Sequence, residues 1–167
     1  MAAISALAEH SERVDKIMIS NDFEPNGIYA MNLYNLGIPF TSIIDDYMPV
    51  WAGSSNLTYA QLGKDRSFWA ATVEKHMAKW YGNYEHTVGG WMNLAVAALN
   101  GSPWEEKQHA YHNKEQIWNF VNDADQDNDI ITAGSNFCGS HNETTEWGVA
   151  CSHAYTIIHT VTIQKDG

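Results

Sequence analysis

Apolar and polar positions recur with two different periods along this chain. From Ser67 to Tyr81, apolar side chains return every three or four residues, at Trp69, Val73, Met77 and Trp80. This spacing places them on one face of a helix, which Ser67 can cap and Gly82 can end. The pattern predicts a long helix with Trp69 and Trp80 in the core.

Other segments also have a helical pattern. Residues 1–9 are small and mostly apolar, which predicts the buried interior of a helix, and Ser11 then caps a short amphipathic segment. The apolar stretch from Trp91 to Leu99 predicts a second helix, which Asn100-Gly101 stops. Asn113 with Gln116 resembles a capping box at the start of a third helix, which carries Trp118 as a core residue.

Two-residue alternation predicts the strands. Residues 27–34 and 38–45 flank the turn Asn35-Leu36-Gly37 and predict a β-hairpin. Residues 130–132 predict a strand after an acidic loop at 123–129, and residues 155–163 predict a long final strand. Because helices mainly precede the last strands, we expect an α+β fold across residues 1–167. About 1–120 would form a mainly helical lobe with a β-hairpin, and about 129–167 part of a β-rich lobe.

The composition predicts a globular domain with an acidic surface. Apolar residues make up 44% of the chain, and 20 acidic residues against 9 basic ones give a formal net charge of −11. Phosphate binding needs clustered Lys and Arg, so this balance argues against nucleic acid and anionic membranes as partners. The sequence contains no run of ~18 apolar residues and no leader pattern, so we expect no membrane insertion and a cytoplasmic location with reduced thiols.

His153 is the candidate for chemistry. It begins the face of the predicted final strand that Tyr155 and Ile157 continue, where a base could reach into a cleft. The pattern alone favours a structural histidine over a catalytic one, because no nucleophile accompanies it. Cys151 lies two residues earlier, ~6–7 Å away along a strand and not aimed for proton transfer, so we expect a structural role. Cys138 is predicted to be a small buried hydrophobe.

Two patterns resemble metal sites. The acids at 123, 125, 127 and 129 alternate like the start of a calcium loop. That loop needs Gly at its sixth position and an acid at its twelfth, where this chain has Asn128 and Gly134, so we predict a solvated loop instead. His109 and His112 could share a metal, but the sequence shows no third ligand, so we expect a wet surface.

Several segments together resemble the protease core of the calpain family of cysteine endopeptidases. Residues 68–85 are similar to the family's Trp-x-x-x-x-Glu-Lys-Ala-x-Ala-Lys-x-x-Gly-x-Tyr-Glu helix, and Gly89-Gly90 follows where the family has paired glycines. Residues 44–50 resemble its Asp-Asp-x-x-Pro segment. Gly148 and His153-Ala154-Tyr155 fit Gly-x-x-x-Gly-His-Ala-Tyr, with Ser152 in place of the second glycine. The resemblance spans essentially the whole chain.

The resemblance implies a papain-like α+β fold and makes His153 the general base of a Cys-His-Asn triad. Residues 1–8 are similar to the continuation of the family's nucleophile helix, so the nucleophilic cysteine would lie three residues before Met1. The orienting asparagine would fall beyond Gly167. We therefore expect an incomplete core that is not competent as given. A trimmed protease, a non-catalytic structural or interaction module, and a site completed by another chain all remain open.

The resemblance also bears on cofactors and partners. The chemistry needs no cofactor. Calcium is possible, because Glu85 matches a calcium-ligand position of the family's calcium-dependent members. The expected partners are protein substrates, or proteins that cover an exposed N-terminal helix.

Overall fold

The computed structural model describes residues 1–138 and 143–164. Its helices are α1 (Ala2–Leu7), α2 (Ser11–Ile17), α3 (Trp69–Tyr81), the 3-10 helix η1 (Glu85–Thr87), α4 (Met92–Asn100) and α5 (Lys114–Gln126). Its strands are β1 (Ile28–Asn35), β2 (Ile38–Asp45), β3 (Ile131–Gly134) and β4 (Ala154–Ile157). Helices and two small antiparallel sheets confirm the predicted α+β class.

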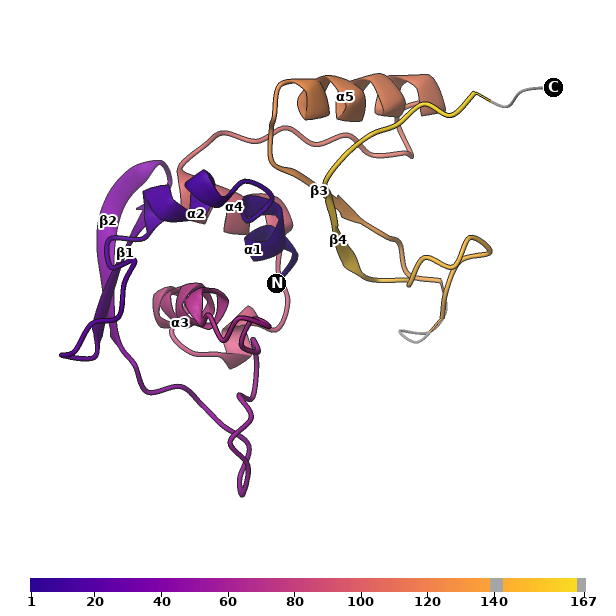
Figure 1. Ribbon diagram of the computed structural model, residues 1–167. Coiled ribbons are helices and arrows are strands. Elements are labelled where there is room, and N and C mark those ends of the chain that lie inside the picture. Colours follow the sequence, from indigo (N-terminus) through magenta and orange to yellow (C-terminus); the bar gives the residue numbers. More distant parts are fainter. Residues whose placement is uncertain (139–142, 165–167) are drawn as a thin grey trace.

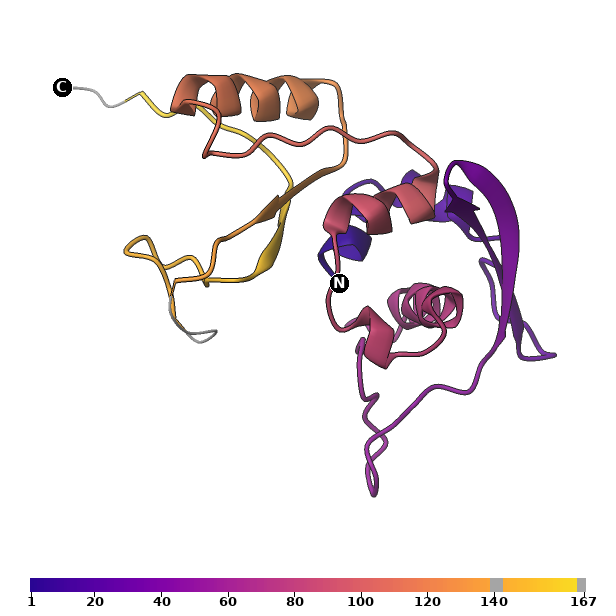
Figure 2. The ribbon, with the colours of Figure 1, turned by 180° about the vertical axis from the view of Figure 1, so that it is seen from behind.

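The elements form two parts that α1 joins. In the first part, the β1–β2 hairpin curves along one side of α1 to α4 (Figure 1). In the second part, α5 and the β3–β4 pair extend away from that group, as the view from behind also shows (Figure 2). Helix α1 contacts α2, α3 and α4 as well as β3 and β4, so it holds the two parts together.

The hairpin follows the predicted register. Ile28 pairs with Asp45 at one end and Asn35 with Ile38 at the other. Leu36 and Gly37 both have positive φ, which is the geometry of a two-residue turn that matches the twist of antiparallel strands. Alternate residues of β1 point inward, so the strand supplies Tyr29, Met31 and Leu33 to the interior.

The main core lies between the hairpin and the helices α1 to α4. Its buried apolar residues come from all these elements: Ala3, Ile4, Leu7, Ile17, Met31, Leu33, Val73, Met77, Ala98 and Leu99. Trp69 and Trp80 pack against it and are partly buried. The apolar residues of α1 are covered by the chain itself. A protein partner over this end of the chain, where Met1 is 64% exposed, stays a prediction.

Three helix boundaries were predicted correctly and two caps were not. Helix α3 ends at Gly82 with φ 101°, and α4 ends at Gly101 with φ 74°. The capping box of Asn113 and Gln116 starts α5. Ser67 does not cap α3, because its hydroxyl donates to Asp65 Oδ1 at 2.6 Å and the helix begins two residues later. Ser11 is already helical in α2 and makes no side-chain cap.

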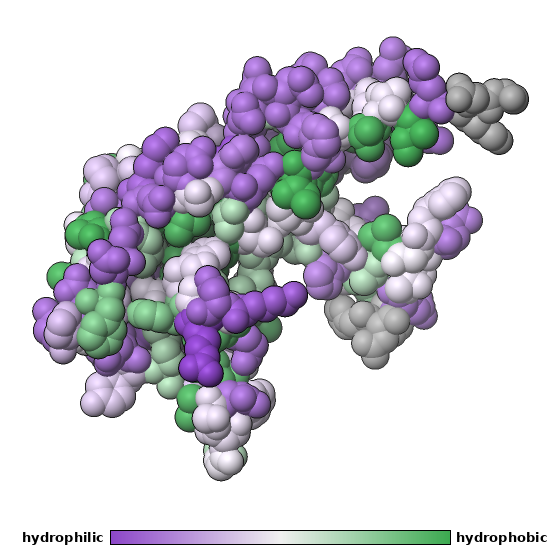
Figure 3. Space-filling model, in the orientation of Figure 1, coloured by the Kyte–Doolittle hydropathy of each residue, from purple (hydrophilic) through white to green (hydrophobic). Residues whose placement is uncertain are grey.

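The predictions for the second part need larger corrections. Helix α5 continues to Gln126, so residues 123–126 of the predicted acidic loop are helical, and hydrophilic residues cover much of this helix (Figure 3). Trp118 is 41% exposed and is not a core residue. The final strand ends at Ile157, because the chain turns to α5 instead: Asp125 Oδ2 accepts hydrogen bonds from the Thr160 amide at 2.9 Å and its hydroxyl at 2.7 Å.

Asp125 holds this end of the chain through its charge as well. Its Oδ2 lies 2.9 Å from His159 Nδ1, and its side chain is only 9% exposed. The hydrogen bonds from Thr160, followed by the neighbouring His159, lower the pKa of the Asp125 carboxyl. A residue that the sequence assigned to a solvated loop therefore anchors residues 159–160 on α5.

Among residues 1–138 and 143–164, no helix combines the length and the apolar character that crossing a membrane requires.

Candidate active site

His153 lies immediately before β4, at the end of the β3–β4 pair. The register of this pair places Gly134 opposite Ala154 and Ala133 opposite Tyr155. Beyond Gly134, Ser135 continues the contact: its amide donates to His153 O at 3.0 Å, and its Oγ accepts from the His153 amide at 3.0 Å. Hydrogen bonds from a neighbouring segment thus fix the backbone of His153 on both sides.

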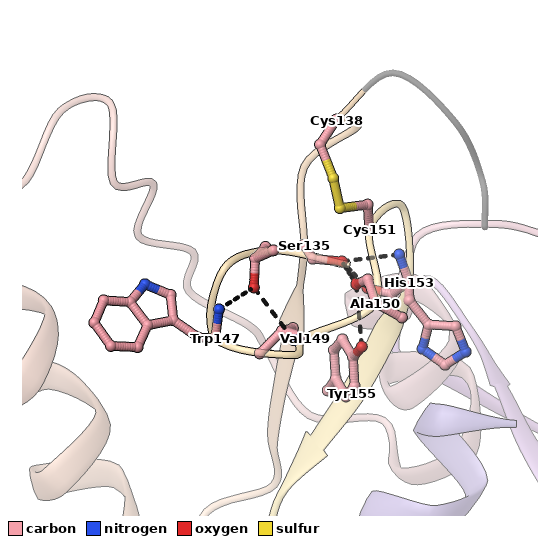
Figure 4. Close-up of a disulfide and its surroundings, with 9 residues drawn as sticks. Ser135, Cys138, Trp147, Val149, Ala150, Cys151, His153 and Tyr155 are labelled. Carbon is pink, nitrogen blue, oxygen red and sulfur yellow. Dashed lines mark hydrogen bonds between the residues drawn. A yellow bond between two sulfur atoms is a disulfide. The ribbon is translucent and has the colours of Figure 1, made fainter. Parts of the chain in front are cut away.

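The exposed imidazole of His153 packs on Tyr155. Their ring centroids are 4.9 Å apart, and the Tyr155 hydroxyl donates to Ala150 O at 3.1 Å (Figure 4). The prediction that His153 and Tyr155 share one face is therefore confirmed. The predicted continuation of this face to Ile163 is wrong, because β4 ends at Ile157.

Strand β4, which His153 directly precedes, packs against the N-terminal end of α1. Thr156 Oγ1 donates to Ala2 O at 3.0 Å, which ties β4 to the first turn of that helix. Beside this junction is a cavity of about 190 Å³ that Ala154 lines together with residues 1–4 and the segment Val88 to Met92. A group at the start of α1 and the residues next to His153 therefore border the same space.

The two cysteines are bonded to each other. Cys138 and Cys151 form a disulfide with their Cα atoms 5.9 Å apart (Figure 4). This corrects the expectation of two reduced thiols, and it corrects the predicted burial of Cys138, which is exposed while Cys151 is 2% exposed. Since these are the only cysteines of the sequence, the 167 residues contribute no free thiol beside His153.

Ser152 explains why a glycine suits this position in the family pattern. Its φ is 52°, in the left-handed region that residues other than glycine enter at a cost. The turn redirects the backbone between the disulfide and His153, and the Ser152 amide donates to Asn136 O at 3.0 Å. The substitution keeps the turn and adds strain to it.

Glu85 is the first residue of η1, exposed and directly after Tyr84. Its neighbours His86 and Thr87 line the cavity that Ala154 also lines, but the side chains of Glu85 and His153 are not part of that lining. In the part of the chain that the structure describes, no three His, Cys, Asp or Glu side chains come together as a metal site. The calcium-ligand role of Glu85 stays a prediction.

The structure adds Ser135 to the site, which sequence reasoning missed. Its contacts are to residues 15 and 18 positions away, so no local pattern marks it. The even number of cysteines in the sequence was one indication of a disulfide. The expectation of a reducing compartment argued against it.

Known proteins with similar sequences indicate the family of this chain. A family model described as "Calpain family cysteine protease" matches residues 1–167. The chain is 26% identical over 164 residues to the calpain-type cysteine protease DEK1 of Zea mays, covering 95% of this chain and 8% of that protein. It is 24% identical over 175 residues to human calpain-7, covering 95% of this chain and 21% of that protein.

A further relative is calpain-A of Drosophila melanogaster, with 28% identity over 165 residues that cover 94% of this chain and 19% of that protein. The chain thus spans less than a quarter of the length of each of these relatives. With the α+β fold and the position of His153, the match over all its residues leads to one assignment. The chain belongs to the calpain family of cysteine proteases.

Proposed function

We propose that this chain forms part of the catalytic core of a calpain-type cysteine endopeptidase, with His153 as its general base. The observation that carries the proposal is the hydrogen bond from Thr156 Oγ1 to Ala2 O, at 3.0 Å. It holds β4 against the start of α1, the helix that is similar to the family's nucleophile helix. A thiol at that end of α1 would lie beside the cavity that Ala154, the residue after His153, helps to line.

In this role the imidazole takes the proton of the thiol and later gives it to the leaving amine. The thiolate attacks the peptide carbonyl carbon, the C–N bond breaks, and water releases the acyl group. His153 is suited to this exchange because its ring is exposed and held by Tyr155, while its backbone is fixed by Ser135. No cofactor is needed for these steps.

The proposed substrates are extended segments of proteins. Val88 and Trp91, which line the cavity near α1, are 82% and 73% exposed. Between them, Gly89 and Gly90 have open space where a side chain would begin. An extended peptide can therefore approach the backbone of residues 89–90 and leave its scissile bond near His153.

A second candidate function is a non-catalytic structural or interaction module. The pairing of Cys138 with Cys151 supports it, since neither sulfur is then free as a nucleophile. The cytoplasmic location remains a prediction. It is compatible with the disulfide when that bond is redox-active, because stable disulfides are rare in reducing compartments.

Peptide hydrolysis by the full-length protein separates the two functions. We expect His153→Ala to lower kcat/KM by at least about a hundredfold, because proton transfer by the base is lost. His109→Ala is the matched control, since His109 is also an exposed histidine but lies in the loop before α5. Equal activity of His153→Ala and wild type would contradict the role of His153. An inactive wild type that a thiol-directed epoxide fails to label would establish the non-catalytic module.

A further inference from the structure

The segment that ends in His153 is fastened at every residue to the segment that follows β3. Ser135 Oγ donates to Ala150 O at 2.6 Å and accepts from the His153 amide at 3.0 Å. Ser135 N donates to His153 O, and Ser152 N donates to Asn136 O, both at 3.0 Å. The disulfide from Cys138 to Cys151 completes the set, which we call the His153 clamp. Figure 4 shows its disulfide and the Ser135 contacts.

The clamp replaces a sheet that cannot continue. The β3–β4 register ends at Gly134 and Ala154, and the left-handed conformation of Ser152 breaks the extended backbone two residues before that pair. Beyond the register, backbone hydrogen bonds hold the segment only singly, from Ser135 N to His153 O, from Ser152 N to Asn136 O and from Cys151 N to Glu143 O, and leave the His153 amide without a backbone acceptor. The Ser135 hydroxyl supplies the missing partners, since one oxygen donates to a carbonyl and accepts from an amide.

The tyrosine that supports the imidazole depends on the same segment. Tyr155 donates to Ala150 O, which is also the acceptor of the Ser135 hydroxyl. Movement of Ala150 would therefore disturb the Tyr155 ring, on which the His153 ring packs. The clamp acts on the imidazole through its backbone and through this neighbouring ring.

The disulfide is built so that one of its sulfur atoms can be reached. Cys138 is an exposed residue, while Cys151 is 2% exposed and directly precedes Ser152 and His153. Attack by a thiolate requires access to one sulfur and a cysteine that can leave from the other. The exposed end of the bond is therefore open to a reductant, and the buried end is fixed to the segment of the base.

We propose that Ser135 and the Cys138–Cys151 disulfide position His153 for catalysis, and that reduction of the disulfide loosens this base. The proposal rests on the proposed endopeptidase function. Ser135 is a positioning residue, because it holds His153 and touches no reacting atom.

A dithiol can act as the reductant of the Cys138–Cys151 disulfide. One dithiol thiolate attacks Cys138 Sγ, the S–S bond breaks, and Cys151 leaves as a thiolate. The second thiol of the reductant closes its own disulfide and releases Cys138. Two electrons pass to the cysteines, and the two protons of the dithiol end on the two new thiols.

Hydrogen exchange of the full-length protein tests the clamp without relying on activity. We expect Ser135→Ala to speed exchange of the His153 amide about tenfold, because that amide loses its acceptor. Ser135→Thr keeps a hydroxyl and should restore slow exchange. Ser54→Ala is the control, since Ser54 also accepts from a backbone amide, that of Asn56 at 3.0 Å, but in an exposed loop. Unchanged exchange in Ser135→Ala would overturn the role of Ser135.

The same measurement tests the disulfide. Reduction of the wild type with dithiothreitol should speed amide exchange across residues 150–153. The double substitution Cys138→Ala and Cys151→Ala should have the same effect without a reductant. Dithiothreitol should have no further effect on the double variant. Equal exchange before and after reduction would remove the disulfide from the clamp.

Peptide hydrolysis then connects the clamp to catalysis. We expect Ser135→Ala to lower kcat about tenfold with little change in KM, and Ser135→Thr to recover most of the loss. Wild-type activity should rise and then fall with increasing dithiothreitol, because the nucleophile needs a reduced thiol while the clamp needs its disulfide. A double cysteine variant as active as wild type would contradict the proposal. An inactive wild type would refute the proposed function, while the exchange data would still decide whether the clamp exists.

Discussion

Lowering the pH from 7.5 to 5 should cost this fold about 2 kcal/mol through one buried imidazole, that of His76. His76 lies on α3 with no exposed surface, its Nδ1 2.8 Å from Ser42 Oγ of β2. Its Nε2 has no hydrogen-bond partner in the part of the chain that the structure describes. Burial, then the charges of Lys79 and Lys75, lower the pKa of His76 to about 4.

The sign follows from the two pKa values. The unfolded chain protonates this histidine below about pH 6.5. The folded chain does so only near pH 4, where the lowered pKa of His76 lies. The unfolded state therefore binds more protons in this window, and the free energy of unfolding falls as the pH falls from 6.5 towards 4. At pH 5, about 1.5 units below the pKa of the unfolded imidazole, this proton uptake lowers the free energy of unfolding by about 2 kcal/mol.

Urea denaturation at pH 7.5, 6.5, 5.5 and 5.0 measures this loss. The matched variant is His76→Gln, which keeps a hydrogen-bonding side chain near Ser42 and cannot be protonated. We expect the wild type to lose about 2 kcal/mol more than the variant between pH 7.5 and 5. NMR titration of the wild-type imidazole gives a second readout, should the variant fold poorly. If the free energies of unfolding of wild type and His76→Gln fall in parallel with pH, and His76 titrates near pH 6.5, then burial does not lower the pKa of His76.

Two substitutions test the packing and the strained turn. Leu33→Ala, at a side chain with 0% exposure, should cost about 2–5 kcal/mol in the free energy of unfolding, whereas Leu36→Ala, at 97% exposure in the hairpin turn, should change it by less than about 0.5. Similar losses for both would show that the β1 face is not the core. Ser152→Gly should stabilise the fold by about 0.5–1 kcal/mol, because glycine relieves the left-handed strain at φ 52°. Ser5→Gly in α1 should instead lose about 0.5 kcal/mol, and a loss for Ser152→Gly would contradict the strained turn.

Local patterns predicted the hairpin and several helix boundaries well. The hairpin, the end of α3 at Gly82 and the capping box of α5 depend on residues within a few positions of one another. Each of these features is therefore written into a short stretch of sequence. The buried interior of α1 was predicted from its small apolar residues and is confirmed.

The second part depends on contacts between distant residues, which periodicity cannot show. The predicted final strand is cut short because β3 has no residue to pair beyond Ile157, since the chain before Ile131 already turns from α5. Asp125 then binds His159 and Thr160, which lie more than 30 positions away in the sequence. Of the candidate site, His153 could be identified from sequence, while Ser135 and the disulfide required the fold.

If His153 activates a thiol at the N-terminal end of α1, the alkylation rate of that thiol depends on pH through the imidazole. The full-length protein is treated with iodoacetamide from pH 5 to 9, and mass spectrometry follows the cysteine nearest the start of α1. A thiolate paired with an imidazolium stays reactive far below the ordinary thiol pKa of about 8.5. We expect rapid alkylation of the wild type at pH 6. The His153→Ala variant should lose this rapid alkylation, and the His109→Ala variant should retain it. Identical profiles for wild type and His153→Ala, each with one step near pH 8.5, would contradict it.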